Sequence, residues 1–221
     1  SKEHGNHLPM GTDYFVTDYV AQEVTKRCDV LTLPTLPYAY FPAFVKWKGS
    51  VSIEHKHFTD YVQDILLSFV RFGVRKFLII DGGVSTHPPL CLLARDLDNS
   101  HNVKVAVSDI RGLAAETENE LCTQKQGGHG DESETSTMLY LHENLVHMDK
   151  AVEEYSEEFP NTIVNGHRKI YFSSRMNTLN GINGNSTLAT KEKGEKILQA
   201  MVDSICDFLK EYIPWMPEAE D

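Results

Sequence analysis

The sequence is poor in cysteine and contains no long apolar run. Its four cysteines, Cys28, Cys91, Cys122 and Cys206, are widely separated, and no Cys-x-x-Cys pair occurs. This spacing indicates neither a zinc knuckle nor a dithiol redox motif, and it favours reduced thiols in a cytoplasmic protein. No apolar run approaches the length that a helix needs to cross a bilayer, so a membrane partner is not expected.

Basic residues are also scarce, and they are not clustered. The chain has 21 Lys and Arg against 32 Asp and Glu, which gives a net charge of -11. Binding to nucleic-acid phosphates or to an anionic membrane surface depends on basic clusters. We therefore expect no nucleic acid and no membrane as partners, and a small-molecule substrate or another protein instead.

Two common enzyme signatures are absent as well. The sequence contains no Gly-x-Ser-x-Gly elbow, which marks one large class of serine hydrolases. It also contains no Gly-x-Gly-x-x-Gly fingerprint of the kind that binds dinucleotides. Neither serine hydrolysis nor nicotinamide chemistry is indicated.

What is present is an alternation of helical and strand-like patterns. Apolar residues at helical spacing predict helices over 13–27, 58–72, 88–97, 134–145 and 190–212. Short apolar runs predict strands over 30–33, 76–80 and 103–107, with loops over 124–132 and 177–187. Strands separated by helices indicate the α/β class, as a three-layer α/β/α sandwich with a mainly parallel central sheet. We expect one domain over residues 1–221.

The first thirteen residues hold the most informative group of polar side chains. Glu3, His4, His7 and Asp13 lie among glycines and a proline, which bend the backbone so that groups near in sequence can converge. Neutral imidazole and carboxylate are ligands that Zn, Mn and Fe accept, so a divalent metal site is the first hypothesis. Solvated histidines in a polar turn are the alternative, and spacing alone leaves both open.

Two further glycine-rich segments, at 81–87 and 127–136, lie between predicted strands and helices, where ligands bind in such folds. The second holds His129, Asp131, Glu132 and Glu134, which can supply metal ligands or a general acid/base pair. Capping of the helix that follows explains the same acidic residues, because carboxylates are favoured at the positive end of the helix dipole. This alternative also stays open.

Together these segments resemble the creatininase (creatinine amidohydrolase) family. The family's opening signature, Glu-x-His-Gly-x-His-Leu-Pro-x-x-Thr-Asp, is matched by residues 4–13, which read His-Gly-Asn-His-Leu-Pro-Met-Gly-Thr-Asp. Its later Gly-His-x-x-x-x-Glu-Thr-Ser element is matched by Gly128, His129 and residues 134–136. Further similar segments at 36–38, 49–53 and 189–195 stand in the family's order, so the resemblance covers nearly the whole chain.

The resemblance implies a creatininase-like α/β/α fold and hydrolysis of cyclic amides with one or two divalent ions, Zn or Mn, with Fe as an alternative. It also implies a homo-oligomer, in many relatives a hexamer. Asp13 would bridge two ions and His4 would bind one, while His129 would transfer protons beside the substrate with support from Glu134. A metal-activated water would attack the carbonyl carbon, and a protonated side chain would supply the leaving nitrogen.

The chain departs from the family pattern at its first ligand. The family's Glu, two residues before the histidine, falls on Lys2, and a one-residue deletion would make Glu3 the ligand instead. His7, Asp131 and Glu132 are lower-ranked candidates for metal ligands. Because the sequence enters this motif at once and begins without Met, we expect an upstream N-terminal strand to be missing from it.

A second departure follows the central strand. The family's Asn-Gly-His-x-Gly/Glu-Asn, which supplies one or two ligands, is replaced by residues 81–86, which read Asp-Gly-Gly-Val-Ser-Thr. Neither Gly83 nor Ser85 can act as those ligands, although Asp81 and His87 are close in sequence.

Three hypotheses follow from these observations. The leading one is a metal-dependent hydrolase of a C–N bond in a small cyclic amide. The second keeps the hydrolase but changes the substrate to a formamide or an oxidised sugar-like ring. The third is a non-catalytic creatininase-like protein that has lost its metal ligands and binds a ligand or assembles.

Overall fold

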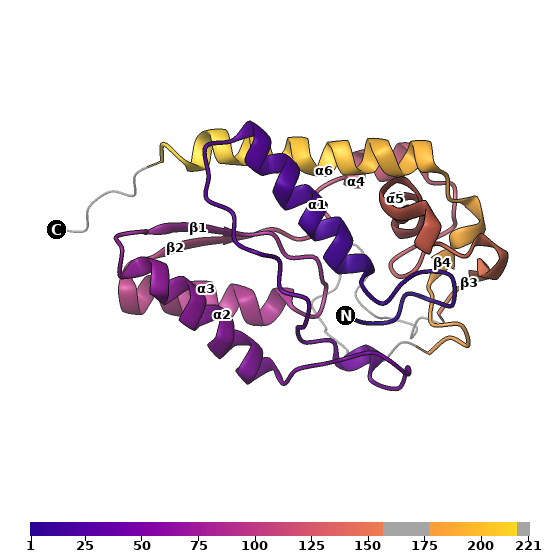
Figure 1. Ribbon diagram of the computed structural model, residues 1–221, viewed down its shortest axis with the longest axis horizontal. Helices are drawn as coiled ribbons and strands as arrows, with labels where there is room; N and C mark the ends of the chain where they lie inside the picture. The colour runs from indigo at the N-terminus through magenta and orange to yellow at the C-terminus, as the bar shows by residue number, and fades with distance from the viewer. Residues whose placement is uncertain (157–176, 216–221) are drawn as a thin grey trace.

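The computed structural model describes residues 1–156 and 177–215. Its centre is a pair of parallel strands, β1 (Lys76–Ile79) and β2 (Lys104–Val107), in which Lys76 is aligned with Lys104. Helices α1 (Thr12–Arg27) and α6 (Lys191–Tyr212) lie on one side of this pair, and α2 (His55–Val70) and α3 (His87–His101) lie on the other (Figure 1). The predicted α/β/α layering and the parallel pairing are confirmed.

The alternation of side chains along β1 explains the two helical layers. Leu78 and Ile80 pack into the core formed with α1, α5 and α6. Phe77 and Ile79 point to the opposite face and pack into the core formed with α2 and α3. Because successive side chains in a strand face opposite sides, an unbroken apolar run is buried on both faces only when both faces are covered.

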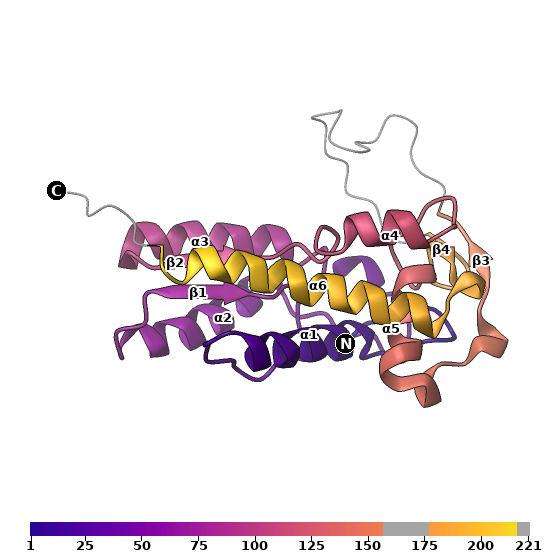
Figure 2. The same ribbon diagram turned by 90° about the horizontal axis from the view of Figure 1, so that it is seen from above.

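The remaining elements gather at one end of the molecule (Figure 2). They comprise α4 (Ala115–Leu121), α5 (Glu132–His142), an antiparallel pair of two-residue strands, β3 (Glu153–Glu154) and β4 (Gly184–Asn185), and short 3-10 turns at Pro42–Phe44, Glu143–Leu145, Met148–Lys150 and Ser186–Leu188. Helix α5 packs closely on α6 at Gly194. A Cβ on this glycine would lie 1.9 Å from the main-chain oxygen of Ser136. The N-terminal segment runs into this same end, which holds the candidate site.

One predicted element is wrong, and one observed helix was not predicted. The segment 30–33 is not a strand, and the side chain of Leu31 is 77% exposed. Pro34 follows this segment and cannot donate a ladder hydrogen bond, so apolar composition alone was a poor guide there. Helix α4 was not predicted, because its sequence AETENEL has too few apolar residues to show a periodic pattern. Within the described residues, no helix combines the length and apolar character that a membrane crossing requires.

Candidate active site

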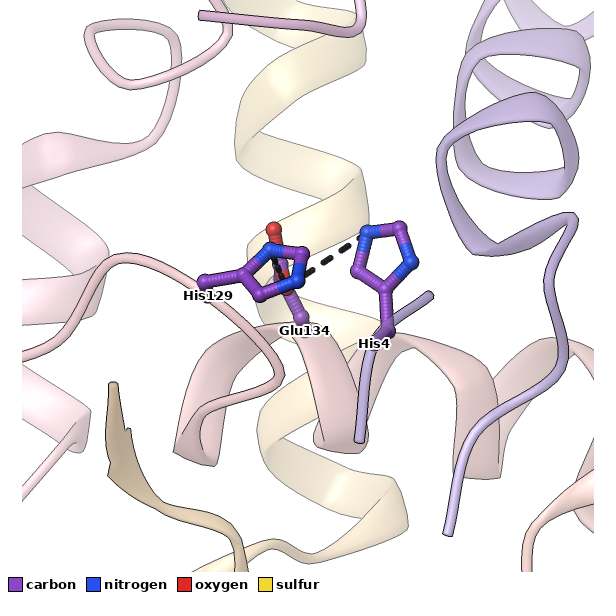
Figure 3. Close-up of side chains that lie close together, drawn as sticks. All are labelled: His4, His129 and Glu134. Atoms are coloured by element: carbon purple, nitrogen blue, oxygen red, sulfur yellow. Dashed lines mark ion pairs between the residues drawn. The ribbon is translucent and has the colours of Figure 1, made fainter. Parts of the chain in front are cut away.

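The candidate site lies where the N-terminal segment meets the loop before α5. Gly5, at φ 79°, and Gly130, at φ 56°, adopt the left-handed conformation that disfavours other residues. A Cβ on Gly130 would lie 2.9 Å from the main-chain oxygen of His4, so glycine is also required for this close approach. His4 and His129 come together as a result, with ring centroids 4.5 Å apart (Figure 3).

His4 is fully buried and is oriented by the main chain. Its Nδ1 lies 3.1 Å from the main-chain oxygen of Lys2, which can only accept, so Nδ1 carries a proton. Its Nε2 lies 3.0 Å from the Lys2 ammonium and 2.8 Å from Oδ1 of Asp13. This nitrogen donates to the carboxylate when it carries a proton and accepts from the ammonium when it does not. A carbonyl that holds one ring nitrogen in place is typical of histidines that bind metals.

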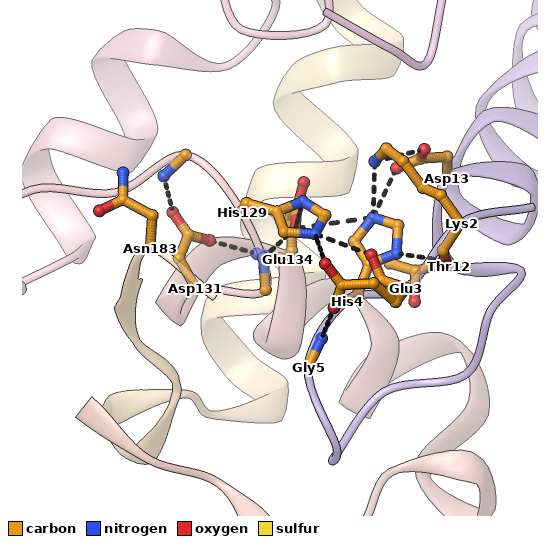
Figure 4. A network of polar contacts seen from close by, with 12 residues as sticks. Lys2, Glu3, His4, Gly5, Thr12, Asp13, His129, Asp131, Glu134 and Asn183 are labelled. Atoms are coloured by element: carbon orange, nitrogen blue, oxygen red, sulfur yellow. Dashed lines mark hydrogen bonds and ion pairs between the residues drawn. The ribbon is translucent and has the colours of Figure 1, made fainter. Parts of the chain in front are cut away.

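Lys2 and Asp13 form a buried ion pair beside His4 (Figure 4). Lys2 Nζ lies 2.7 Å from Asp13 Oδ2, and it also lies 5.3 and 5.0 Å from the ring centroids of Phe41 and Phe44. Burial by itself raises the pKa of Asp13, but the charges of Lys2 and His4 outweigh burial and hold that pKa well below its usual range. The Asp13 carboxylate is therefore ionised, and a lysine neutralises it.

His129 is held in place from both sides. Its main-chain N–H and oxygen pair with Asn183, with N–O distances of 3.4 and 2.7 Å, and its Nε2 donates to the main-chain oxygen of Glu3 at 2.7 Å. Burial lowers the pKa of His129 well below its usual value, so the imidazole is neutral. Its Nδ1 consequently carries a lone pair, which lies 3.9 Å from Oε2 of Glu134.

Glu134 approaches the two histidines from the first turn of α5. Its Oε2 accepts a hydrogen bond from the Gly130 N–H at 2.5 Å and lies 3.8 Å from Nε2 of His4. The side chain is 30% exposed, which makes it more accessible than either histidine. Burial nevertheless raises the pKa of Glu134, partly offset by the charges of His4 and Lys2. A carboxyl with a raised pKa can hold and release protons closer to neutral pH than an ordinary glutamate.

Three possible ligand atoms therefore converge, one each from His4, His129 and Glu134, and all lie within 4.8 Å of one another. Two nitrogen ligands and one carboxylate oxygen form a donor set that suits Zn, Mn or Fe. Five main site residues were predicted from the sequence: Glu3, His4, Asp13, His129 and Glu134. The structure brings His4, His129 and Glu134 together. Asp13 contacts Lys2 and His4, and Glu3 contacts His129.

Glu3 and His7 have partners other than Asp13 in the structure. Oε2 of Glu3 accepts from the Gly5 N–H at 2.8 Å, and its Oε1 lies 3.3 Å from Nε2 of His129. Nε2 of His7 bonds the Thr135 hydroxyl at 2.8 Å, and burial lowers the pKa of this histidine to about 4. Glu3 therefore neighbours the site through His129, whereas His7 connects the N-terminal loop to α5. Neither has the ligand position that the sequence suggested.

Asp131 and Glu132 have structural partners. Oδ1 of Asp131 accepts from the main-chain N–H groups of residues 133 and 134, at 3.0 Å each, and so caps α5. Glu132 is fully buried, accepts from the main-chain N–H groups of residues 123 and 124, and pairs with Lys193 at 2.5 Å. The capping interpretation explains Asp131, and a buried ion pair explains Glu132, so neither is placed as a metal ligand.

The segment after β1 supplies no replacement ligand at the cluster. A Cβ on Gly83 would lie 2.7 Å from the Thr86 hydroxyl, so this position is filled by packing. Asp81 accepts from that hydroxyl at 2.5 Å, and burial raises its pKa to about 6. Oδ2 of Asp81 lies 3.5 Å from His87, whose Nε2 lies 3.4 Å from Sγ of Cys91. Burial raises the pKa of this thiol, so the arrangement does not produce a reactive thiolate.

Sequence reasoning missed Lys2 as a member of the site. The sequence did show a lysine at the position where a carboxylate ligand was expected, and that mismatch was the available signal. The contact with Asp13 was not predictable from it, because the two residues are 11 positions apart and meet only through the turn of the N-terminal loop, where Lys2 N–H bonds the Met10 oxygen at 3.1 Å.

Comparison with protein families decides to which family the chain belongs. The model of the creatininase family, described as creatinine amidohydrolase, matches residues 3–209. The chain belongs to the creatininase family. The match spans both segments that meet in the candidate site, and the family resemblance seen in the sequence is confirmed.

Characterised relatives of this creatininase-family chain are hydrolases. The chain is 26% identical to the creatinine amidohydrolase of Pseudomonas putida, with 96% of this chain and 86% of the relative covered. It is 22% identical to a 3-dehydro-scyllo-inosose hydrolase of Thermotoga maritima, with 98% of this chain and 76% of the relative covered. The family thus contains amidohydrolases and related hydrolases, and sequence identity at this level does not choose among their substrates.

Solved structures agree on the fold. A crystal structure of creatininase superposes with a TM-score of 0.79 at 26% identity, covering 97% of this chain and 88% of that one. A putative creatinine amidohydrolase from Bacteroides fragilis gives 0.82 at 22% identity, covering 97% and 87%. Mn and Zn–Zn forms of creatininase are among the similar structures. Metal-bound forms are therefore established for these relatives.

Proposed function

We propose that this chain is a hydrolase that cleaves a C–N bond in a small cyclic amide, and that the reaction centre is the cluster of His4, His129 and Glu134. The observation that carries the proposal is the convergence of three ligand atoms within 4.8 Å in a buried setting with one partly exposed member. Each histidine is fixed by a main-chain oxygen on one ring nitrogen. The other nitrogen of His4 contacts Lys2 and Asp13, and the other nitrogen of His129 faces Glu134.

The donors among the residues that the structure describes fit one divalent ion but not two. Two ligand atoms about 2.1 Å from one tetrahedral ion lie about 3.4 Å apart. Glu134 Oε2 lies 3.8 Å from His4 Nε2 and 3.9 Å from His129 Nδ1, so a small inward movement would let these three residues hold an ion. Within residues 1–156 and 177–215 no donors are free for a second ion beside this cluster, because Asp13 is paired with Lys2 and Gly83 carries no side chain.

A bound divalent ion would supply a Lewis acid for the substrate carbonyl and would acidify a water. The residues of the chain handle the protons. Burial raises the pKa of Glu134, which brings its proton exchange closer to neutral pH, and Nδ1 of neutral His129 can accept a proton. The Glu134 carboxylate would take a proton from water and return it to the leaving nitrogen.

The substrate class is proposed from the relatives. Creatinine is a small cyclic amide, and the Pseudomonas putida relative is named for its hydrolysis. The Thermotoga maritima relative is named for an oxidised ring sugar, so such a ring, or a formamide, is the alternative substrate for the same reaction centre.

A second candidate function is favoured by the Lys2 ion pair. Because Lys2 and Asp13 both contact His4 Nε2, an ion binds there only when these contacts are given up. A protein in which Lys2 keeps this position permanently would bind a small molecule without hydrolysing it.

A combined metal and turnover experiment tests the proposal. The purified protein would be loaded with Zn or Mn, dialysed, analysed for bound metal, and assayed on lactams, formamides and cyclic ketones. We expect turnover of at least one class, lost in Glu134→Gln. Metal binding without turnover, or neither, would favour the non-catalytic function.

We also propose a cytoplasmic homo-oligomer. The four cysteines are free, as expected in a reducing compartment. Tyr61, Phe72 and Leu92 expose 53%, 85% and 61% of their surface, and apolar side chains of this kind are often covered in subunit interfaces. Light scattering of the purified protein measures the assembly, with a hexamer as the expectation taken from the family and a monomer as the contrary result.

A further inference from the structure

We propose that the Lys2 ammonium is the resident cation of this site: it takes the place between His4 and Asp13 where a divalent ion would otherwise bind. Lys2 would hold this position whether or not the protein turns a substrate over. The ammonium therefore competes directly with metal ions for the same two donors.

The surroundings of the ammonium are those of a cation site. A carboxylate oxygen of Asp13 lies 2.7 Å from Nζ, and an imidazole nitrogen of His4 lies 3.0 Å away. The ring faces of Phe41 and Phe44 supply further negative potential at 5.3 and 5.0 Å. Lys2 is only 5% exposed, so this charge is stabilised by these neighbours rather than by water.

The fold fixes the position of Lys2, which is not a surface side chain that meets Asp13 by chance. The Lys2 N–H bonds the Met10 oxygen at 3.1 Å, and the Lys2 oxygen accepts from Nδ1 of His4 at 3.1 Å. The side chain thus begins at an anchored main chain and ends at a buried carboxylate. A lysine confined in this way is expected to remain at His4 and Asp13.

The charges around His4 and Asp13 explain why the Lys2 ammonium and a second divalent ion do not bind there together. Asp13 offers one negative charge, and the ammonium already neutralises it. A divalent ion at the same donors would place a further double charge within a few ångströms of Lys2 in a poorly hydrated site. The ammonium therefore limits the centre to one divalent ion, bound weakly, at His4, His129 and Glu134.

Thermal unfolding of Lys2→Met with and without Zn²⁺ tests this proposal. Methionine keeps the apolar stem and removes the charge, so Asp13 loses its partner and the metal-free variant unfolds below wild type. We expect the affinity for Zn²⁺, measured by titration calorimetry, to rise at least about tenfold in the variant. Zinc at about 100 times the variant's Kd should raise its Tm by about 5–10 °C, and wild type by clearly less at the same concentration.

Lys193→Met is the matched control. Lys193 pairs with the fully buried Glu132, so its loss also leaves a carboxylate without a cation, but away from His4. This variant should lose stability and gain no zinc response. The double variant Lys2→Met/Asp13→Asn should recover stability without zinc and lose the enhanced response. If Lys2→Met does not fold without zinc, the same Tm and zinc-affinity measurements are made on Lys2→Gln.

Two outcomes would overturn the proposal. One is a Lys2→Met protein with the Tm and zinc affinity of wild type. The other is an equal gain of zinc response in Lys193→Met. Neither measurement uses a substrate, so both test the role of Lys2 independently of the proposed hydrolase activity. The absence of that activity would not contradict the role of Lys2, and its presence would not establish it.

Discussion

The Nζ atom of Lys2 lies 2.7 Å from Oδ2 of Asp13, and the two side chains are only 6% and 15% exposed. This ion pair makes Asp13 a carboxylate that the fold requires in its ionised form. The charges of Lys2 and His4 lower its pKa despite burial. Both the stability of the protein and its interaction with metals should therefore depend on these residues.

Asp13→Asn should destabilise the protein in a pH-dependent way. It leaves the buried Lys2 ammonium unpaired, which we expect to cost about 3 kcal/mol at pH 7. Because the folded pKa of Asp13 is lowered, its contribution is complete above the unfolded pKa of about 4 and is lost as the pH falls below it.

Urea unfolding of wild type and Asp13→Asn at pH 7, 5 and 3 measures this effect. The difference between the two proteins should be constant from pH 7 to 5 and shrink at pH 3. Asp207→Asn is the control, since the Lys210–Asp207 pair is 73% and 71% exposed and should contribute little. A difference that stays the same at pH 3 would argue against an ionised, paired Asp13.

His7 should make the protein less stable in mild acid. Burial lowers its pKa to about 4, so the unfolded chain binds a proton more readily than the folded one, and stability is lost as the pH falls from about 6.5 towards 4. The loss attributable to this residue should reach about 3 kcal/mol.

Urea unfolding of His7→Gln over the same pH range checks the prediction. The variant should be less stable than wild type near pH 7, since it disturbs the contact with Thr135. The gap should narrow as the pH is lowered to 4. Parallel curves for the two proteins would show that His7 is not the titrating group.

Glu134→Gln and Glu132→Gln should distinguish a carboxylate that takes part in the reaction from one that stabilises the fold. The first keeps an oxygen for the Gly130 N–H but removes the proton-transfer group, so kcat/KM on the substrate found in the panel should fall at least about 100-fold with little change in Tm. The second weakens the buried pair with Lys193 and should lower Tm with a smaller loss of kcat/KM in the remaining folded protein. The reverse pattern would exchange their roles.

Gly194 should tolerate no side chain. A Cβ there would lie 1.9 Å from the Ser136 oxygen, so Gly194→Ala forces α6 away from α5 and should cost about 3 kcal/mol or more. Gly73→Ala is the control, because a Cβ at Gly73 meets nothing within 4 Å and the cost is limited to its left-handed backbone, about 1 kcal/mol. Equal losses of unfolding free energy in the two variants would contradict the close packing of α5 and α6.

The layered fold could be predicted from the sequence because its evidence is local. The apolar run of β1 and the helical spacing in α2 and α6 each show their structure within one segment. Residues 30–33 show the limit of that approach, since an apolar run becomes a strand only when a neighbouring strand is available for pairing. Helix α4 was missed for the opposite reason, because a short polar helix depends on its surroundings.

The site could be predicted only in part. The motif pattern identified His4, Asp13, His129 and Glu134 as important residues, and the structure brings these four side chains into one network. The sequence alone could not show that Glu134 faces the histidines while Asp131 and Glu132 bind other partners. Asp131 caps α5 and Glu132 turns to Lys193, and which of three adjacent acids faces the histidines depends on the rotation of the helix.

The amount of divalent metal that the wild-type protein retains tests the proposed centre most directly. The purified protein would be saturated with Zn²⁺, passed through a desalting column and analysed by mass spectrometry for zinc per chain. With Lys2 in the place of the second cation, we expect no more than about one zinc per chain, against the two of a binuclear site, and loss of that zinc in His129→Asn. Two zinc ions per chain in wild type would contradict the role assigned to Lys2.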